Sequence, residues 1–159
     1  MPPRRAGKAA LAAEAWRLLF DFFLLTRPQR DRVLEDLGLT PNDVRTLSTL
    51  MHAPEGRTMR SLAEAWSCDA SNATWMVDRL EERGLAERRS RPGDRRVKLV
   101  ALTPAGVKAK ARLLAGMYEA PPELLRLPRR ALEALRDAAA QLPRRPEGPL
   151  LGGGRRSRD

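Results

Sequence analysis

The sequence has very few of the residues that build disulfides, metal centres and catalytic sites. It contains one cysteine, Cys68, and one histidine, His52, in 159 residues. A single cysteine excludes an internal disulfide framework, and the two residues together are too few for a four-ligand zinc site within one chain. We therefore expect no metal and no cofactor. Without a second histidine, a cysteine–histidine pair or a nucleotide-binding loop, the sequence gives no support for an enzyme.

Long apolar runs are also missing. None approaches the roughly 18 to 20 residues of a membrane-spanning helix, and the first residues lack the apolar segment of a secretory signal. We expect a cytoplasmic protein. Positive charge is in excess, because 30 Lys and Arg against 20 Asp and Glu give a net charge of +10. Such a balance predicts a polyanionic partner, either nucleic acid or an anionic membrane surface, and the membrane is the weaker choice.

The central stretch, residues 58–103, has the pattern of a helix, a tight turn, a second helix and a basic hairpin. Apolar residues recur at i, i+3, i+4 and i+7 in both predicted helices, which gives each helix one apolar stripe. The members are Met59, Leu62, Ala63 and Trp66 in the first helix, and Ala73, Met76, Val77 and Leu80 in the second. Only residues 67–69 separate the helices, with Asp69 placed to cap the second. This spacing predicts a helix-turn-helix.

Two strand-like runs follow, residues 85–91 and 97–103, joined through a turn that contains Pro92 and Gly93. Gly84 is expected to end the second helix in the left-handed conformation. From Arg88 to Lys98 the sequence has six cationic side chains and one anionic side chain, Asp94. We expect this hairpin to bind an anion.

The motifs in residues 78–88, 93–96 and 102–106, DRLEERGLAER, GDRR and LTPAG, resemble those of MarR-type transcription regulators. The matching motifs span roughly the central third of the chain. The resemblance implies a mainly α-helical fold with a small β-hairpin wing. It also implies an obligate homodimer that binds palindromic double-stranded promoter DNA, with a recognition helix in the major groove and a wing arginine in the minor groove. Family members are more often repressors, and release by a small-molecule effector is implied as well.

Polar residues opposite the apolar stripe of the second helix are the candidates for contact with bases. Asn72 can bond adenine in a bidentate manner, whereas Arg79 is better placed for phosphate. Asp78 and Glu82 are expected to face the groove edge or to pair with Arg79 and Arg83. The alternative for each residue is a solvated polar face. The predicted contacts of this helix are Ser71, Asn72, Thr74, Trp75 and Arg79.

Trp75 departs from the family pattern, which commonly has a basic or small polar residue at this position. The ring could press on a thymine methyl group or a sugar, or it could pack on the wing or a neighbouring helix. The sequence leaves both interpretations open. In the wing, the DNA-binding candidates are Arg91, Arg95 and Arg96; we favour Arg95 as the residue that enters the minor groove and Arg96 as the partner of Asp94.

Apolar residues near both ends of the chain predict a second layer of helices, which forms a dimer interface. Residues 9–25 form a helix that is apolar around most of its circumference, so we expect it to be buried on more than one side, in part by another subunit. The leucines of residues 123–142 are expected to complete this dimerisation layer. The predicted organisation is a basic arm (1–8), N-terminal dimerisation helices (9–37), a DNA-binding domain (38–103), C-terminal dimerisation helices (104–142) and a disordered basic tail (143–159).

Three alternatives remain open from the sequence. Cys68 could be a redox switch, because a helix N-terminus lowers a thiol pKa, or it could be a small apolar residue that fills the turn. His52 is expected to be an ordinary helix-end residue. The whole chain could also be a non-specific nucleic-acid-binding protein or a winged-helix interaction module.

Overall fold

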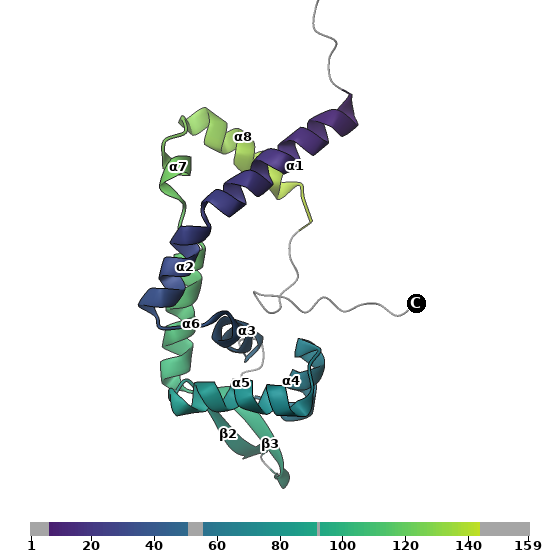
Figure 1. The fold of residues 1–159 in the computed structure, drawn as a ribbon, viewed down its shortest axis with the longest axis vertical. Helices are drawn as coiled ribbons and strands as arrows, with labels where there is room; N and C mark the ends of the chain where they lie inside the picture. The colour runs from purple at the N-terminus through teal and green to yellow at the C-terminus, as the bar shows by residue number, and fades with distance from the viewer. Residues whose placement is uncertain (1–6, 51–55, 92, 144–159) are drawn as a thin grey trace, which may run out of the picture.

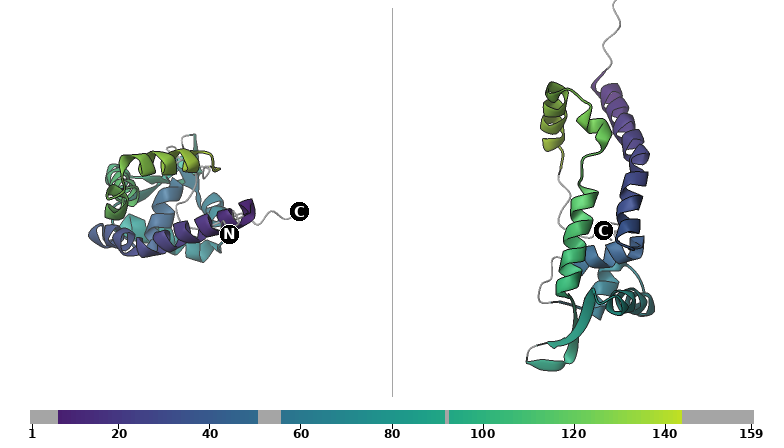
Figure 2. Two further views of the ribbon diagram at one scale, coloured as in Figure 1. Left: turned by 90° about the horizontal axis from the view of Figure 1, so that it is seen from above. Right: turned by 90° about the vertical axis from the view of Figure 1, so that its left-hand side faces the viewer.

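The molecule is elongated, with helices at one end and a β-hairpin at the other (Figure 1). The computed structural model describes residues 7–50, 56–91 and 93–143. Helices α1 (Lys8–Leu25) and α8 (Arg129–Ala140) lie at one end, and strands β2 (Ala86–Arg91) and β3 (Asp94–Leu102) form the hairpin at the other. Helices α2 (Arg27–Asp36) and α6 (Pro104–Met117) run side by side between them (Figure 2), and α7 (Pro122–Leu125) lies between α6 and α8 in the chain. The fold is mainly helical with a small sheet, as predicted.

The predicted helix-turn-helix consists of α4 (Met59–Trp66) and α5 (Ala70–Glu82). The Asp69 carboxylate accepts a hydrogen bond from the Asn72 backbone N–H at 2.8 Å, which confirms Asp69 as the cap of α5. Ser67 adopts the left-handed conformation with φ 50°, so that the chain reverses within three residues. The stripe of α5 is buried as predicted, with Ala73, Met76, Val77 and Leu80 each at most 3 % exposed.

The core lies where α4 and α5 pack against α3 (Pro41–Leu50) and the sheet. Trp66 is its largest fully buried side chain, and its indole N–H donates to Thr49 Oγ1 at 2.9 Å. This bond satisfies the one polar atom of the ring, so the whole indole can be buried. Among the described residues, the other fully buried apolar side chains are Val44, Leu47, Leu50, Leu62, Ala73, Val77, Leu80, Val100 and Leu113.

The sheet has a third strand that the sequence analysis missed, β1 (Arg57–Thr58). It pairs antiparallel with β3, placing Arg57 opposite Val100, and the strand order is β1-β3-β2. Two residues are too few to produce an alternating pattern, so only the tertiary contact reveals this strand. Strand β3 also begins earlier than predicted, because Asp94 pairs with Arg91 at the tip of the hairpin.

Local side-chain hydrogen bonds mark three helix starts and breaks. Thr40 Oγ1 accepts the Asp43 N–H at 3.2 Å, and Thr103 Oγ1 accepts the Gly106 N–H at 3.0 Å, so both threonines cap their helices. Helix α1 ends at Leu25, and α2 begins two residues later with a proline in its first turn. There the Thr26 hydroxyl donates to the Phe22 carbonyl at 3.0 Å.

The inward face of α6 is formed by Gly106, Lys110 and Leu113, whereas Val107 is 54 % exposed. At Gly106 the helix approaches the chain before β2 closely, because a Cβ at this position would lie 1.9 Å from the Leu85 carbonyl oxygen. A glycine is therefore required where α6 crosses the base of the hairpin.

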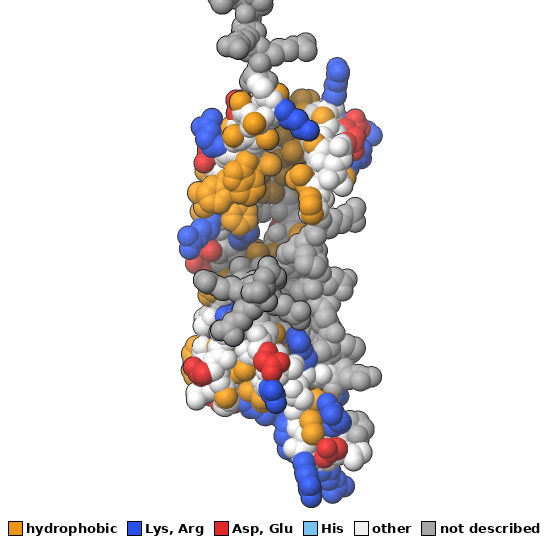
Figure 3. Space-filling model, turned by 90° about the vertical axis from the view of Figure 1, so that its right-hand side faces the viewer, with side chains coloured by type: hydrophobic (Ala, Val, Ile, Leu, Met, Phe, Trp, Pro, Cys, Tyr) orange, Lys and Arg blue, Asp and Glu red, His pale blue; other side chains and the backbone are white. Residues whose placement is uncertain are grey.

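Apolar side chains cover the end of the molecule opposite the hairpin (Figure 3). Helix α1 has no buried residue, and Trp16 and Phe20 lie with ring centroids 5.9 Å apart on its surface. Within the described residues, no helix is long and apolar enough to cross a membrane. His52 and Met51, the first six residues and the tail from 144 onward lie outside the described residues, as do the predictions made for them.

Candidate nucleic-acid interface

The outer face of α5 presents the polar residues that the sequence singled out. Ser71, Asn72, Thr74 and Trp75 are all exposed, on the side of the helix opposite the core. Because Asp69 already binds the Asn72 backbone N–H, the capped first turn holds the Asn72 side chain at the start of the helix. Thr74 Oγ1 donates its proton to the Ala70 carbonyl at 2.8 Å, so toward a ligand it offers lone pairs and a methyl group.

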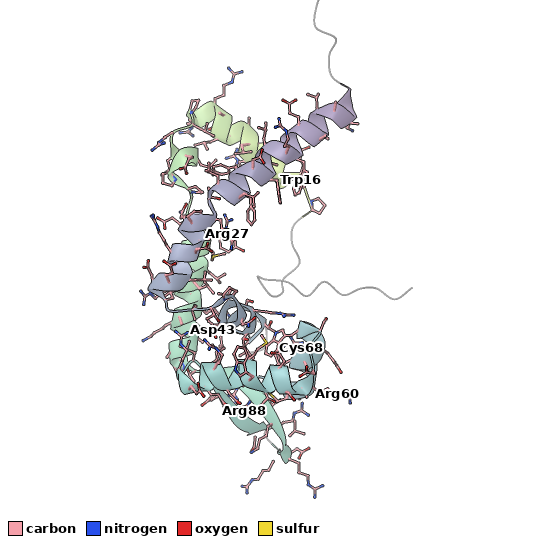
Figure 4. All side chains as sticks on the ribbon, viewed as in Figure 1. Trp16, Arg27, Asp43, Arg60, Cys68 and Arg88 are labelled. Atoms are coloured by element: carbon pink, nitrogen blue, oxygen red, sulfur yellow. The ribbon has the colours of Figure 1, made fainter. Side chains whose placement is uncertain are left out.

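Two acidic residues of α5 form ion pairs with one arginine of the hairpin. Arg88 on β2 forms an ion pair with Asp78 at 2.7 Å and a second ion pair with Glu81. The Arg88 backbone N–H also donates to Glu81 Oε1 at 2.7 Å. Asp78 therefore pairs with a hairpin arginine and not with Arg79, as the helical spacing had suggested. These contacts connect β2 to α5, and the single charge of Arg88 offsets one of the two negative charges (Figure 4).

Arg79 and Arg83 are partly exposed and extend toward α3, where both bind Asp43. Each guanidinium lies 3.3 Å from an Asp43 carboxylate oxygen, and the Asp43 side chain is only 1 % exposed. Arg83 also donates to the Gly38 carbonyl at 2.6 Å and the Leu37 carbonyl at 3.0 Å, which binds the end of α5 to the α2–α3 connection. The structure thus gives Arg79 an intramolecular partner where the sequence indicated a phosphate contact.

The Asp43 carboxylate is held in its charged form by these contacts. Burial on its own raises the pKa, but hydrogen bonds from Thr40 and Arg79 outweigh it, and the pKa of Asp43 lies below its usual value. The Thr40 backbone N–H donates to Asp43 Oδ2 at 2.8 Å. Asp43 is therefore an anchor for the far end of α5, 36 and 40 residues away in sequence. No local pattern in the sequence pointed to it.

Near the tip of the wing, Arg91 at the end of β2 and Arg95 and Arg96 at the start of β3 are exposed. Asp94 Oδ1 accepts a hydrogen bond from the Arg96 backbone N–H at 3.0 Å. Asp94 thus shapes the tip through the backbone of Arg96, where the sequence analysis expected an ion pair with its side chain. Which arginine enters a groove stays a prediction.

Hydrogen bonds between Thr103, Gly84 and Leu85 connect the wing to the rest of the fold. Gly84 has φ +65°, as predicted for a helix end, and its carbonyl accepts the Thr103 hydroxyl proton at 2.6 Å. The Thr103 N–H donates to the Leu85 carbonyl at 3.2 Å. Since Thr103 also caps α6, one side chain joins the end of α5, the end of β3 and the start of α6. The sequence identified the cap but not the contact with Gly84.

Cys68 lies in the turn between α4 and α5, partly buried against the core. Burial raises the pKa of its thiol, with Asp69 adding to the effect, although Arg45 opposes it. A raised pKa is the opposite of the shift that activates a thiol. The raised pKa and the packing of Cys68 against the core therefore favour the small residue that fills the turn over the activated thiol. Among the described residues no group of acidic, histidine or cysteine side chains could hold a metal ion.

Comparison with known proteins finds a similarity over the central part of the chain. Residues 37–97 match the sequence profile of the MarR family. A protein proposed as the transcriptional regulator of the hcr operon in Thauera aromatica is 38 % identical over 76 residues. That match covers 48 % of this chain, and the chain spans 45 % of the length of this relative.

Solved structures show the same fold. The multiple antibiotic-resistance repressor MarR of Listeria monocytogenes superposes with a TM-score of 0.72 at 20 % identity, covering 85 % of this chain and 94 % of that one. A point mutant of S. aureus MepR, bound to an oligodeoxyribonucleotide, gives 0.67 at 23 % identity, with 79 % and 93 % covered. CouR of Rhodococcus jostii, bound to p-coumaroyl-CoA, gives 0.51 at 29 % identity, with 82 % and 92 % covered. Residues 37–97 of this chain are thus similar to the MarR family, and the chain shares the winged helix-turn-helix fold of these solved structures.

Proposed function

We propose that this protein is a homodimeric repressor that binds an inverted-repeat operator in the cytoplasm. The observation that carries the proposal is the placement of two different surfaces at opposite ends of the molecule. The outer face of α5 and the wing arginines lie together at one end, and exposed apolar side chains of α1 and α8 lie at the other (Figures 1 and 3). The first surface suits DNA and the second suits a partner copy.

DNA recognition follows from the chemistry of the first surface. Ser71, Asn72 and Thr74 offer donors and acceptors at the N-terminal half of α5, which is the part of a recognition helix that meets base edges. The wing arginines are exposed, so they suit the deep negative potential of a narrow minor groove. We propose residues 38–103 as the DNA-binding domain.

Dimerisation follows from the exposed apolar surface. Trp16 is 67 % exposed, and Phe20 and Phe23 are about half exposed on the same helix. A monomeric protein rarely exposes a contiguous patch of this kind, and a second copy would cover it through the same residues. We propose that residues 9–37 and 104–142 form this dimerisation layer. Two recognition helices about 34 to 36 Å apart would then meet successive major grooves.

An effector is the remaining part of the proposal. CouR was solved with p-coumaroyl-CoA bound, and small-molecule release is implied by the family resemblance. A ligand that binds between the dimerisation layer and α3–α5 would change the spacing of the two recognition helices. Such a ligand would lower the affinity of the dimer for its operator.

Binding to DNA is tested by fluorescence anisotropy at two salt concentrations. The probes are a duplex from upstream of the protein's own gene, a duplex selected from a randomised library, and a scrambled duplex of equal length. A specific regulator should prefer one of the first two by about 10³-fold or more. Equal and steeply salt-dependent binding to all three would reject the proposal in favour of the non-specific nucleic-acid binder.

The dimer is tested by analytical ultracentrifugation of the wild type and two double variants. Trp16→Ser with Phe20→Ser removes apolar area from the exposed face of α1, and it should shift the protein toward monomer. Glu14→Ser with Asp21→Ser changes two exposed charged residues of the same helix and serves as the matched control. A Trp16–Phe20 double variant that keeps the wild-type mass distribution would place the interface elsewhere.

A further inference from the structure

Trp75 is unusual among the apolar residues of the DNA-binding domain. Its side chain is 48 % exposed, whereas Met76 and Val77 beside it are at most 3 % exposed. In the described part of the chain from α3 to β3, it is the one large apolar side chain that is exposed. The structure therefore does not bury this ring in the wing or a neighbouring helix, which was one of the two interpretations of the sequence.

The ring is supported on one side by Arg79. The Arg79 guanidinium carbon lies 5.3 Å from the centroid of the Trp75 ring, within the range of a cation–π contact. Arg79 is in turn held by Asp43, toward which its Nε and Nη2 point at 3.3 and 3.4 Å. Asp43 is itself fixed by Thr40 and Arg83. A chain of contacts thus leads from a buried carboxylate to the exposed ring.

This arrangement gives Arg79 a different role from a phosphate contact. Two of its nitrogens face a buried carboxylate, which Arg83 also binds, and its guanidinium lies against an aromatic ring, so its position is determined by contacts within the protein. The held ring loses little side-chain freedom when it meets a ligand, because its support is already in place. A rigid apolar ring on the outer face of a recognition helix suits an apolar group on a base edge.

We propose that Trp75 contacts the C5-methyl group of a thymine in the major groove, with Arg79 and Asp43 as positioning residues that hold the ring. Thymine is the one base that presents a methyl group in this groove, so the contact distinguishes T·A from the other base pairs. The inference rests on the proposed DNA-binding function and adds to it the chemical group that this position reads.

The test replaces thymine by deoxyuridine, one position at a time, in the operator half-site obtained from the library selection. This substitution removes only the methyl group. For the wild type we expect a loss of affinity of about fourfold at one position, the effect of burying one methyl group. For Trp75→Ala we expect no loss at that position, and Trp75→Leu, which keeps an apolar contact, should recover part of it. Circular dichroism and thermal unfolding confirm that each variant is folded.

Arg79→Met distinguishes a positioning residue from a phosphate contact. A positioning role predicts a smaller deoxyuridine penalty with an unchanged salt dependence of binding. A phosphate contact predicts that the slope of log affinity against log salt falls by about one. Arg95→Ala on the wing serves as the comparison, since it is expected to show that smaller slope and an unchanged deoxyuridine penalty.

Two results would overturn the inference. Either all deoxyuridine substitutions leave wild-type affinity unchanged, or the loss is the same in the wild type and Trp75→Ala. Both results can occur with a protein that still prefers its operator to the scrambled duplex, and then only this inference fails. A protein without that preference would fail the proposed function first, and this inference with it.

Discussion

Lys110 provides the sharpest test of the structure, because a lysine is rarely buried. It lies on the inner face of α6 between Gly106 and Leu113 and is 8 % exposed. Burial lowers the pKa of Lys110 from its usual 10.5 to about 8, since the charged form is poorly hydrated there. The described residues give it no ion-pair partner. At neutral pH the folded protein must therefore keep a poorly hydrated charge.

The effect of Lys110 on the free energy of unfolding follows from proton linkage. Between pH 8 and 10.5 the unfolded chain keeps the Lys110 proton and the folded chain loses it, so stability rises with pH in this window. Below pH 8 the full penalty is present, and the shift corresponds to about 3 kcal/mol at pH 7. We expect Lys110→Met, which removes the charge and keeps the length, to stabilise the protein by about this amount at pH 7. At pH 10.5 the gain should shrink to below about 1 kcal/mol.

The assay is urea unfolding at a fixed protein concentration, repeated from pH 7 to 10.5 for both proteins. The difference between them isolates Lys110 from the other groups that titrate in this range. Lys108→Met, an exposed lysine on the same helix, is the control and should change the stability by less than about 0.5 kcal/mol. A Lys110→Met variant that is less stable than the wild type at pH 7 would refute the reasoning, because it would mean that the charge has a partner.

Three further predictions concern Asp43, Gly106 and Cys68. Asp43→Asn should destabilise the protein by about 2 kcal/mol at pH 7, since two partly exposed arginines lose a buried partner. Because the pKa of Asp43 is lowered, this contribution is present above its usual pKa of 3.8 and is lost as pH falls, so acid titration of urea unfolding should show the difference vanish. Gly106→Ala should cost more than about 3 kcal/mol, because the added Cβ meets the Leu85 carbonyl, and the melting temperature measures it. The Cys68 thiol should react with iodoacetamide at pH 7 more slowly than it does in the urea-unfolded chain, since burial raises its pKa.

The local features of the fold were predictable because each depends on residues close together in sequence. The caps at Thr40, Asp69 and Thr103 each bind a backbone N–H three residues ahead, and the stripe of α5 repeats within four residues. The hairpin strands were recognisable from composition and the Pro-Gly turn. The exposed residues of α5 follow directly from its buried stripe, since the opposite face of a helix is determined by the same period.

The predictions that failed depended on contacts between distant segments. Asp78 was expected at the groove edge or paired with an arginine of its own helix, and Arg79 was expected on phosphate. In the structure Asp78 binds Arg88 on β2, and Arg79 binds Asp43 on α3. On α6, the backbone contact at Gly106 places Lys110 on the inner face of the helix. The sequence of one helix does not distinguish a charged side chain that forms an ion pair from one that does not. The difference depends on which charged groups the neighbouring elements bring close.

The sequence by itself determined the helix-turn-helix, the basic wing and the excess of positive charge, because periodicity, capping and charge are properties of local residues. Only the tertiary structure decided which of these charges are free to meet DNA. Arg79, Arg83 and Arg88 bind carboxylates of the fold, whereas Arg91, Arg95 and Arg96 are exposed at the wing tip. The physical reason is that an ion pair needs two groups within about 4 Å, a distance set by packing between elements and not by position in the chain.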